Sequence, residues 1–427
     1  MAIRNRYFAS LMIFNREAFT RAVAKTSSWL TARRLRAQGL LLALCLWTVY
    51  LWNMTSPGLI DRAGNIKGTD FLHFYTLGSL ALAHRGADLY HVRAQAVLLA
   101  QRVPQAAGTV YLPLYPPQVS LLFMPLALLS YTPALVLWLS FSSLIYGLCC
   151  YAFWRASRSL RGYGTTVLIL AIAFPAFWHL IAWGQTSALA LACFTVAYFA
   201  LRARREFLAG VALGCLIFKP QLAVAAAIAF VFALRWQVVS AAILAAAAQL
   251  AAARLYYAPG TLRDWMRTLL LIPHMLSPLE PRLYQTHSLR TFWAMLLPWP
   301  SVAFGFYLLT AILVCLLTIA CWRSHLDLSL RFSALLLATV LLAPHLTVYD
   351  LVILAPAFLL IADWIVTQPN HFFAPVFKLL LYFAMAAPLL APVVHWIHFQ
   401  PSVPVMAALL CGLWKIGRNS AVLTNSH

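Results

Sequence analysis

The chain reads Gly68-Thr69-Asp70-Phe71-Leu72-His73-Phe74-Tyr75 and, a few residues later, Gly86-Ala87-Asp88-Leu89-Tyr90. This stretch follows the first long apolar run, at 40–55, and brings a carboxylate, an imidazole and several aromatic rings into a very apolar chain. After Asp70 the pattern predicts two amphipathic helices, at about 70–86 and 88–102, that lie at a membrane interface without crossing it. The stretch therefore marks a long outer segment after the first membrane crossing.

The composition of the whole chain predicts an all-α polytopic membrane protein. Of its 427 residues, 63% are hydrophobic and only 10% are charged, whereas soluble domains are about 25% charged. Apolar runs of roughly 15 to 25 residues recur along the whole length, as membrane helices require. The period-two alternation of a membrane β-barrel is missing from the sequence pattern. We therefore expect one membrane domain, at 40–418, after a basic N-terminal segment at 1–39 and before a short tail at 419–427.

Basic clusters orient the expected crossings. Arg155, Arg158 and Arg161 follow one apolar run and Arg202, Arg204 and Arg205 follow another, and such clusters are typical of cytoplasmic loops. The pattern predicts about 12 crossings with both termini in the cytoplasm. The expected spans are 40–55, 134–154, two between 155 and 202, 207–218, 222–234, 237–253, 301–322, 330–343, 348–366, 373–394 and 402–414. The run at 118–131 is short and contains Pro125, so we expect a partial or re-entrant helix there.

Charge and cysteine usage exclude several functional classes. The net charge of +21 comes from 31 Lys and Arg against 10 Asp and Glu. The basic residues flank the spans and do not form one face, which favours contacts with membrane lipids and argues against nucleic acid. The eight Cys lie within or beside apolar runs without metal-ligand spacing. His395 and His398 have a spacing that could hold a metal, but no third ligand lies nearby in sequence. We therefore expect no metal site and no cofactor.

The few acids allow candidates for a catalytic carboxylate to be compared one by one. Six are expected near the outer face: Asp61, Asp70, Asp88, Asp264, Glu280 and Asp350. Four of these have ordinary interpretations, which are a solvated turn for Asp61, a helix cap for Asp88, an ion pair for Asp264 and a proline-flanked loop for Glu280. Asp70 and Asp350 remain as candidates for proton transfer.

Both remaining acids have a structural interpretation and a functional one. Asp70 could cap a helix together with Thr69, or act in a partly dry pocket beside His73, which lies one helical turn further on. Asp350 lies within an apolar run, where an acid is a functional candidate or makes a structural hydrogen bond to a neighbouring helix. Lys219 lies between two apolar runs, and either binds a lipid phosphate or extends its ammonium to the headgroups. The residues alone leave these alternatives open.

The order of the motifs resembles that of family 87 glycosyltransferases, which have the multi-spanning C-type fold. The resemblance covers roughly residues 40–365 and includes the opening Asp-Phe motif with its aromatics, and the Gly-x-x-Leu-Tyr motif. It also includes Tyr115-Pro116-Pro117, Gly184-Gln185, Lys219-Pro220-Gln221 and the segment Pro344-His345-Leu346-Thr347-Val348-Tyr349-Asp350. This chain departs from the family at the last motif. Better-known members have a His, usually after a Trp, at the start of that helix, and here His345 and Asp350 are both candidates for its role.

The resemblance implies transfer of a hexose, usually mannose, from a polyprenyl-phosphate-sugar donor to a lipid-linked or glycan acceptor. It places the reaction on the outer face of a bacterial cytoplasmic membrane and makes Asp70 the catalytic base. A single base without a second catalytic carboxylate is typical of direct displacement with inversion. The leaving phosphate needs cations, for which Lys219, Arg282 and Arg290 are candidates. The other expected substrate-binding residues are His73, Tyr75, Tyr115, Gln185, Gln221, His345, Tyr349 and Asp350.

A secondary transporter is the main alternative from the sequence. It would also have about 12 spans, and Asp350 and Lys219 would be its charged residues inside the membrane. Transporters usually place polar residues on broken helices at the bilayer midplane and show internal repeat symmetry. Here the polar residues gather in two long outer segments, at 56–115 and 254–290, and the sequence pattern shows no repeat. The two classes differ in what Asp70 does, because only the transferase needs it as a base.

Overall fold

The computed structural model describes residues 21–272 and 282–424, and in these residues the chain is helical without a β-sheet. The only strand-like pairings in this part are two isolated antiparallel bridges, Ile60 with Ile66 and Thr286 with Thr347. This confirms the all-α class. The helices of ten or more residues are α2 (Ala32–Met54), α3 (Thr69–Leu82), α4 (Val92–Arg102), α6 (Tyr131–Ala156), α9 (Ser187–Arg202), α12 (Trp236–Tyr256), α13 (Pro259–Leu271), α16 (Pro300–Arg323), α17 (Leu328–Leu342), α18 (Ala355–Thr367), α19 (Phe373–Ala386) and α21 (Ser402–Thr424).

Shorter helices connect or extend these elements. The α-helices among them are α5 (Gln118–Phe123), α7 (Gly164–Ile172), α8 (Pro175–Trp183), α10 (Glu206–Gly214), α11 (Val224–Phe232), α15 (Leu289–Leu296) and α20 (Ala391–Ile397). The 3-10 helices are η1 (Gly86–Tyr90), η2 (Pro104–Ala106), η3 (Leu126–Leu128), η4 (Arg158–Tyr163), η5 (Cys215–Phe218), η6 (Pro220–Leu222), η8 (Leu283–Gln285), η9 (Val348–Leu354) and η10 (Ala387–Leu390). Pro116 and Pro117 precede α5, as predicted, and the short α5 and η3 confirm that 118–131 forms only a partial helix.

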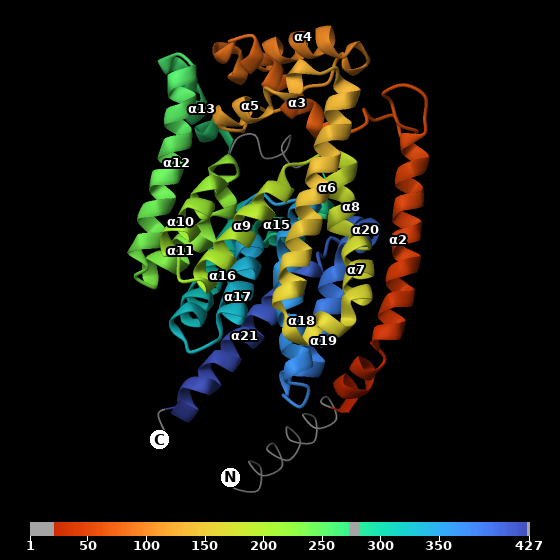
Figure 1. Cartoon of the computed structure of the whole chain (residues 1–427), viewed down its shortest axis with the longest axis vertical. Helices are drawn as coiled ribbons and strands as arrows, with labels where there is room; N and C mark the ends of the chain where they lie inside the picture. Colours follow the sequence, from red (N-terminus) through yellow and green to blue (C-terminus); the bar gives the residue numbers. More distant parts are fainter. Residues whose placement is uncertain (1–20, 273–281, 425–427) are drawn as a thin grey trace, which may run out of the picture.

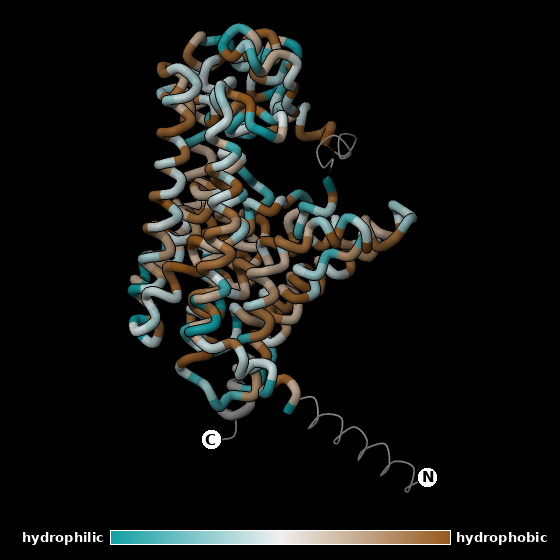
Figure 2. Tube along the Cα trace, turned by 90° about the vertical axis from the view of Figure 1, so that its right-hand side faces the viewer, coloured by the Kyte–Doolittle hydropathy of each residue, from teal (hydrophilic) through white to brown (hydrophobic). Residues whose placement is uncertain are grey.

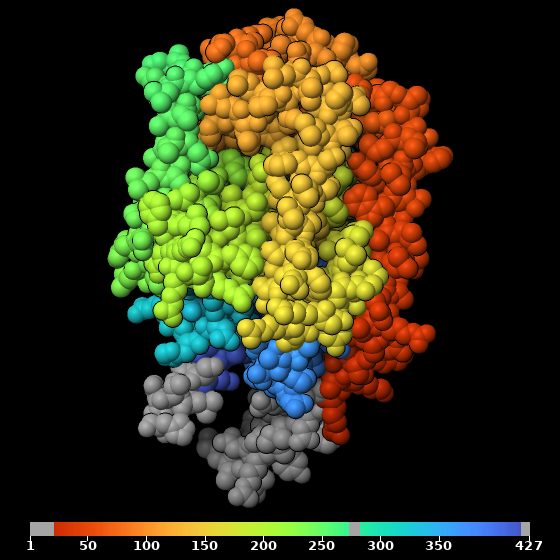
Figure 3. Space-filling view, viewed as in Figure 1, coloured from red at the N-terminus to blue at the C-terminus, as the bar shows by residue number. Residues whose placement is uncertain are grey.

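The molecule is elongated, with a cap of helices at one end. Figure 1 shows α3, α4, α5 and α13 at this end, whereas α2 begins and α21 ends at the opposite end. The space-filling view shows the same cap as a continuous mass above the long helices (Figure 3). Hydrophobic residues dominate the middle of the molecule, and hydrophilic ones gather mainly toward its ends (Figure 2). This distribution fits helices that cross a membrane between two polar ends.

The number of long membrane helices is smaller than the sequence predicts. In the described part of the chain six helices are long and apolar enough to cross a membrane, or seven if the bent pair formed by 158–172 and 175–183 is one span. We expected about 12 crossings. Four of the remaining expected segments are helical but short: Ser187–Arg202, Glu206–Phe218, Pro220–Phe232 and Leu328–Leu342 have only 10–17 residues. The last expected segment, 402–414, lies in the longer α21, which is not among the six. Three of the four short helices begin or end beside a buried polar residue, which is Ser187 for the first and Lys219 for the next two.

The first outer segment is more deeply packed than predicted. It was expected to begin with an amphipathic helix at 70–86, but every residue of α3 from Phe71 to Ala81 is buried. The helix packs against α5 so closely that a Cβ on Gly78 would overlap the carbonyl oxygen of Phe123. Aromatic rings of both helices add to this packing, with Phe74 stacked on Phe123 at 4.8 Å between ring centroids. The helix therefore forms the core of the cap and not an interfacial layer, while α4 follows as a more exposed helix.

Candidate active site

Asp70 lies in the first turn of α3, at the surface where the cap meets the long helices. The residue before this helix, Gly68, has a positive φ of 70° and makes no side-chain cap. Thr69 donates its hydroxyl to the carbonyl of Ile66 at 2.8 Å. The predicted structural role, in which Asp70 caps the helix with Thr69, is therefore wrong. The carboxylate of Asp70 is partly exposed, and its Oδ2 accepts a hydrogen bond of 2.7 Å from Gln185.

Gln185 reaches Asp70 because a helix ends directly before it. The helix α8 stops at Gly184, which has a φ of +71° that glycine adopts without strain. A Cβ on Gly184 would come within 2.6 Å of the Cβ of Phe71, so only glycine lets the two segments approach this closely. The carbonyl of Gly184 also accepts a hydrogen bond of 2.8 Å from Trp138. These contacts place the amide of Gln185 directly beside the first turn of α3.

The other end of the Gln185 amide belongs to a buried charged cluster. Its Oε1 accepts from the Lys219 ammonium at 3.4 Å, and Lys219 donates to Oδ1 of Asp350 at 2.7 Å and to Ser187 at 3.1 Å. Ser187 in turn donates to the same Oδ1 at 2.5 Å. Lys219 is only 4% exposed and Asp350 only 2%. Lys219 thus pairs with Asp350 inside the protein and does not extend its ammonium to the lipid headgroups, which was one of its two expected roles.

Asp350 also organises the loop that precedes it. Its Oδ2 accepts from the backbone and the hydroxyl of Thr347, at 3.4 and 3.5 Å, in a capping box at the start of η9. The next residue back, Tyr349, accepts a hydrogen bond of 3.2 Å from the Gln185 amide. The second outer segment joins the same loop, because the backbone of His287 donates to the carbonyl of Leu346 at 3.1 Å. Asp350 therefore has the structural hydrogen bonds that its sequence position allowed.

The electrostatic surroundings give Asp70 the character of a base. Burial raises the pKa of Asp70 to about 6. The hydrogen bond from Gln185 and the charges of Lys219 and His345 lower this pKa, while the nearby Asp350 raises it. A carboxylate with a pKa near 6 is ionised at neutral pH and accepts a proton more readily than an ordinary aspartate.

His73 is buried beside Asp70 and makes no protein hydrogen bond. It is 5% exposed, and neither ring nitrogen has a partner in the described part of the chain. Its ring lies 4.9 Å from the ring of Tyr111 and 5.8 Å from that of Tyr115, measured between centroids. Burial lowers the pKa of His73 to about 3, so the ring is neutral and has one donor and one acceptor to offer.

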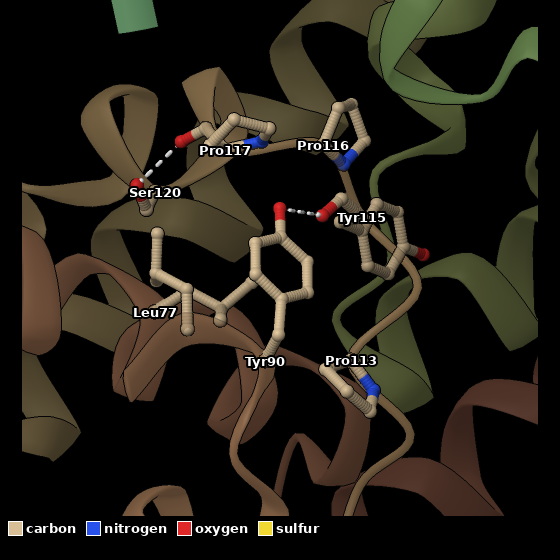
Figure 4. Close-up of a pocket in the computed structure, with 8 residues that line it drawn as sticks. Leu77, Tyr90, Pro113, Tyr115, Pro116, Pro117 and Ser120 are labelled. Atoms are coloured by element: carbon tan, nitrogen blue, oxygen red, sulfur yellow. Dashed lines mark hydrogen bonds between the residues drawn. The ribbon is translucent and has the colours of Figure 1, made fainter. Parts of the chain in front are cut away.

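Tyr115 enters the site from a loop that a neighbouring tyrosine holds in place. The hydroxyl of Tyr90 donates to the backbone carbonyl of Tyr115 at 3.0 Å, and Figure 4 shows the phenol of Tyr115 pointing away from Tyr90. That phenol approaches Oε1 of Gln185 at 3.5 Å. The hollow between Tyr90, Pro113 and Pro117 leaves no room for a water molecule, so we interpret it as a packing feature and not as a ligand site.

Other predicted site residues lie outside this cluster. Tyr75 donates to the carbonyl of Leu129 at 2.8 Å and accepts from Arg102 at 2.9 Å, which ties it to the cap. Arg290 donates to the carbonyl of Pro344, next to His345. Arg282 is exposed. Gln221, in η6, has no side-chain hydrogen bond to the described residues.

The remaining acids behave largely as their sequence context indicated. Asp61 accepts from the backbone of Ala63 and Asn65 in a turn, both at 2.9 Å, and Asp264 pairs with Arg267 at 3.6 Å. Asp88 is the exception. It pairs with Arg85 at 2.7 Å, and the helix that it was expected to cap is preceded by His91. Glu280 lies outside the described residues.

Ser187 is the participant that the sequence analysis missed. It is fully buried, and it connects Lys219 with Asp350. The run of four polar or small residues from Gly184 to Ser187, at the start of an otherwise apolar helix, is the signal that could have indicated it.

The comparisons with known proteins give one match, to a sequence family. The sequence model described as "Glycosyltransferase family 87" matches residues 114–348, which is more than half of the 427 residues. Neither the curated proteins nor the solved structures compared with the chain gave a match. The matched region contains Tyr115, Gln185 and Lys219, whereas Asp350 lies just after its end and Asp70 well before its start. With several apolar helices long enough to span a bilayer, the chain belongs to glycosyltransferase family 87 and is a membrane glycosyltransferase.

Proposed function

We propose that the protein transfers a hexose, with mannose as the first candidate, from a polyprenyl-phosphate-sugar donor to a lipid-linked or glycan acceptor, with Asp70 as the general base. The observation that carries this proposal is the Asp70 carboxylate, which is partly exposed, hydrogen-bonded by Gln185 and raised in pKa to about 6. A base needs an accessible oxygen and a pKa near the working pH. Of the two acids in the cluster, only Asp70 meets both conditions, because Asp350 is buried in its pair with Lys219.

The proposed reaction is one displacement with inversion. The acceptor hydroxyl attacks the anomeric carbon, the bond from that carbon to the phosphate oxygen breaks, and Asp70 takes the hydroxyl proton. The polyprenyl phosphate leaves as a stable anion, so it needs cations and not an acid. Lys219 is already neutralised by Asp350 at 2.7 Å, which leaves Arg290 and Arg282, on the second outer segment, as the candidates for holding the phosphate. His73, whose two ring nitrogens have no partner among the described residues, is suited to bind a sugar hydroxyl.

The membrane arrangement proposed with this function is the C-type glycosyltransferase fold in a bacterial cytoplasmic membrane. The active site would face the periplasm or the outside, and both termini would lie in the cytoplasm. Clusters of Arg on loops away from the cap support this orientation. About 12 crossings would require the bent pair, α21 and each of the four short helices to traverse the bilayer once, in addition to the six long helices. The secondary transporter is not pursued further, because membership of the family makes the protein an enzyme.

The direct test is Asp70→Asn in membranes, measured as hexose transfer from a polyprenyl-phosphate donor to endogenous acceptor lipids. The variant keeps the shape of the side chain and removes the base, so transfer is expected to fall about 10²- to 10⁴-fold. Asp88→Asn is the matched control, because Asp88 lies in the same outer segment but pairs with Arg85. Full transfer by Asp70→Asn at an unchanged protein level would exclude Asp70 as the base.

A further inference from the structure

A long apolar groove lies in the half of the molecule that is remote from the cap. It has a volume of about 1100 Å³ and runs between α2, α7, α18 and α19. In Figure 1 α2 stands at the edge of the bundle, with α7 as its nearest neighbour, and Figure 3 shows it as the outer wall of that side. The volume is at the upper end of ligand sites, which have roughly 300–1,000 Å³. No part of this groove takes part in the cluster around Asp70.

One charged side chain faces this groove without a partner. Among the described residues that line it, Lys378 is the only charged one, and no Asp or Glu is among them. Lys378 makes no hydrogen bond and no ion pair within the described part of the chain. Tyr382 lies one turn further along α19, lines the same groove and likewise has no hydrogen-bond partner in that part. A lysine ammonium in apolar surroundings is costly unless an anion or water accompanies it.

The length of the groove indicates what kind of molecule fits. Its lining begins just before α2, between Ala24 and Thr31, and the part along α2 runs from Ala32 to Cys45, which is about 20 Å at a rise of roughly 1.5 Å per residue. One leaflet contributes roughly 15 Å of the hydrocarbon core, so the groove has the length of one leaflet and not of the whole bilayer. It follows the first half of α2, whereas Asp70 comes after the end of this helix at Met54. The groove therefore belongs to the leaflet opposite the reaction.

We propose that the groove binds an anionic glycerophospholipid of the leaflet on the side where α2 begins, with the lipid phosphate at Lys378 and Tyr382 and its acyl chains along α2 and α18. The ammonium and the phenol donate hydrogen bonds to the phosphate, and the apolar side chains replace neighbouring lipid around the tails. The absence of an acid among the described lining residues selects an anionic headgroup, because nothing there would hold the ammonium of a zwitterionic one. This site does not depend on the proposed sugar transfer.

The test uses the full chain in phosphatidylcholine nanodiscs with phosphatidylglycerol as the probe. Bound lipid is counted by native mass spectrometry, and the thermal midpoint is followed because a ligand of the folded state raises it. We expect Lys378→Met to bind phosphatidylglycerol at least about tenfold more weakly than the wild type. Lys378→Arg keeps the charge and is expected to retain binding. Lys415→Met, which removes an exposed lysine from α21, is the matched control and is expected to bind as the wild type does.

A second variant tests whether the tails occupy the groove. Ala362 lines it on α18, and Ala362→Trp would fill the space without changing any charge. Loss of phosphatidylglycerol in both Lys378→Met and Ala362→Trp supports the proposal. Retention in either monodisperse, helical variant overturns it, as does displacement of the lipid by inorganic phosphate alone. Displacement by a polyprenyl phosphate more effectively than by phosphatidylglycerol would instead assign the groove to the donor, and would also overturn the proposal.

Discussion

Two lysines in apolar surroundings have opposite environments in this protein. Lys219 lies between the short helices η5 and η6 and is held by Asp350, Ser187 and Gln185. Lys378 lies within the long helix α19 and faces a groove without any protein partner in the described part of the chain. The charge of Lys219 is thus satisfied by the fold, whereas that of Lys378 is left for something outside the protein. A lysine in an apolar run therefore indicates a site only when its own structure does not neutralise it.

The largest expected difference between the two lysines is in the free energy of unfolding lost when each is replaced by Met. Lys219→Met leaves Asp350 buried without its partner, and removing one member of a buried ion pair costs about 3–5 kcal/mol. Lys378→Met removes no hydrogen bond or ion pair to the described residues, so in phosphatidylcholine alone its effect is expected to stay within about 0.5 kcal/mol. Unfolding of both variants in denaturing detergent micelles, followed by circular dichroism, measures the difference. Equal losses would show that the fold depends on the two charges alike.

The pH profile of the wild type tests whether the cluster that joins Asp70 to Lys219 supports proton transfer. Because Asp70 has a pKa raised to about 6 and must be ionised to accept a proton, kcat/KM is expected to be constant above this pH. Below it, the rate is expected to fall about tenfold per pH unit as the carboxylate becomes protonated. Rates measured from pH 4.5 to 8 with donor and acceptor well below saturation would show this limb. A profile without a fall in this range would separate the cluster from proton transfer.

Gln185→Leu is expected to give a smaller change in the same profile. The amide donates to the Asp70 carboxylate at 2.7 Å and so favours its ionised form. Removing it is expected to move the acidic limb to higher pH and to lower the rate near pH 6 a few-fold. The rate on the plateau at high pH, where Asp70 is ionised in both proteins, measures separately how far Gln185 also positions the carboxylate. A limb that moves to lower pH would contradict the hydrogen bond as we describe it.

The smallest expected effect is the shift in the pKa of Asp70 that follows when Lys219 or Asp350 loses its charge. The direction of this shift is the test. Lys219 lowers the pKa of Asp70 and Asp350 raises it. The acidic limb is therefore expected to move to higher pH in Lys219→Met and to lower pH in Asp350→Asn, measured on the folded fraction of each. A purely structural pair would change the amount of active protein without moving the limbs in opposite directions.

The sequence predicted which residues form the site better than it predicted their burial and their contacts. Asp70, Gln185, Lys219 and Asp350 were all singled out because polar residues are conspicuous in so apolar a chain. Their contacts could not be predicted, because they join segments 34 to 131 residues apart in sequence, with 115 residues between Gln185 and Asp70. Ser187 was missed because a small hydroxyl residue in an apolar helix usually bonds its own backbone.

The fold shows the same division. Helices appear wherever apolar runs predicted them, since the runs themselves determine local structure. The count of about 12 crossings stays a prediction, because only six or seven helices of the described residues are long enough to cross and hydropathy does not show where a helix will end. Burial of α3 was also unpredicted. Its pattern of aromatic and polar residues is typical of an interface, and only α5, packed against Gly78, turns it into a core element.

The close contact at Gly78 has a consequence for how the protein tolerates change. Gly78 lies eight positions after Asp70, which is about 12 Å along the helix at a rise of roughly 1.5 Å per residue. The backbone of Phe123 leaves no space for a methyl group at this position. Gly78→Ala would therefore shift helix α3 as a whole, together with the Asp70 carboxylate in its first turn. A misplacement of about 1 Å can reduce a rate about 10²-fold. The position of the catalytic carboxylate thus depends on the absence of a side chain at Gly78, although this residue lies far from the substrate.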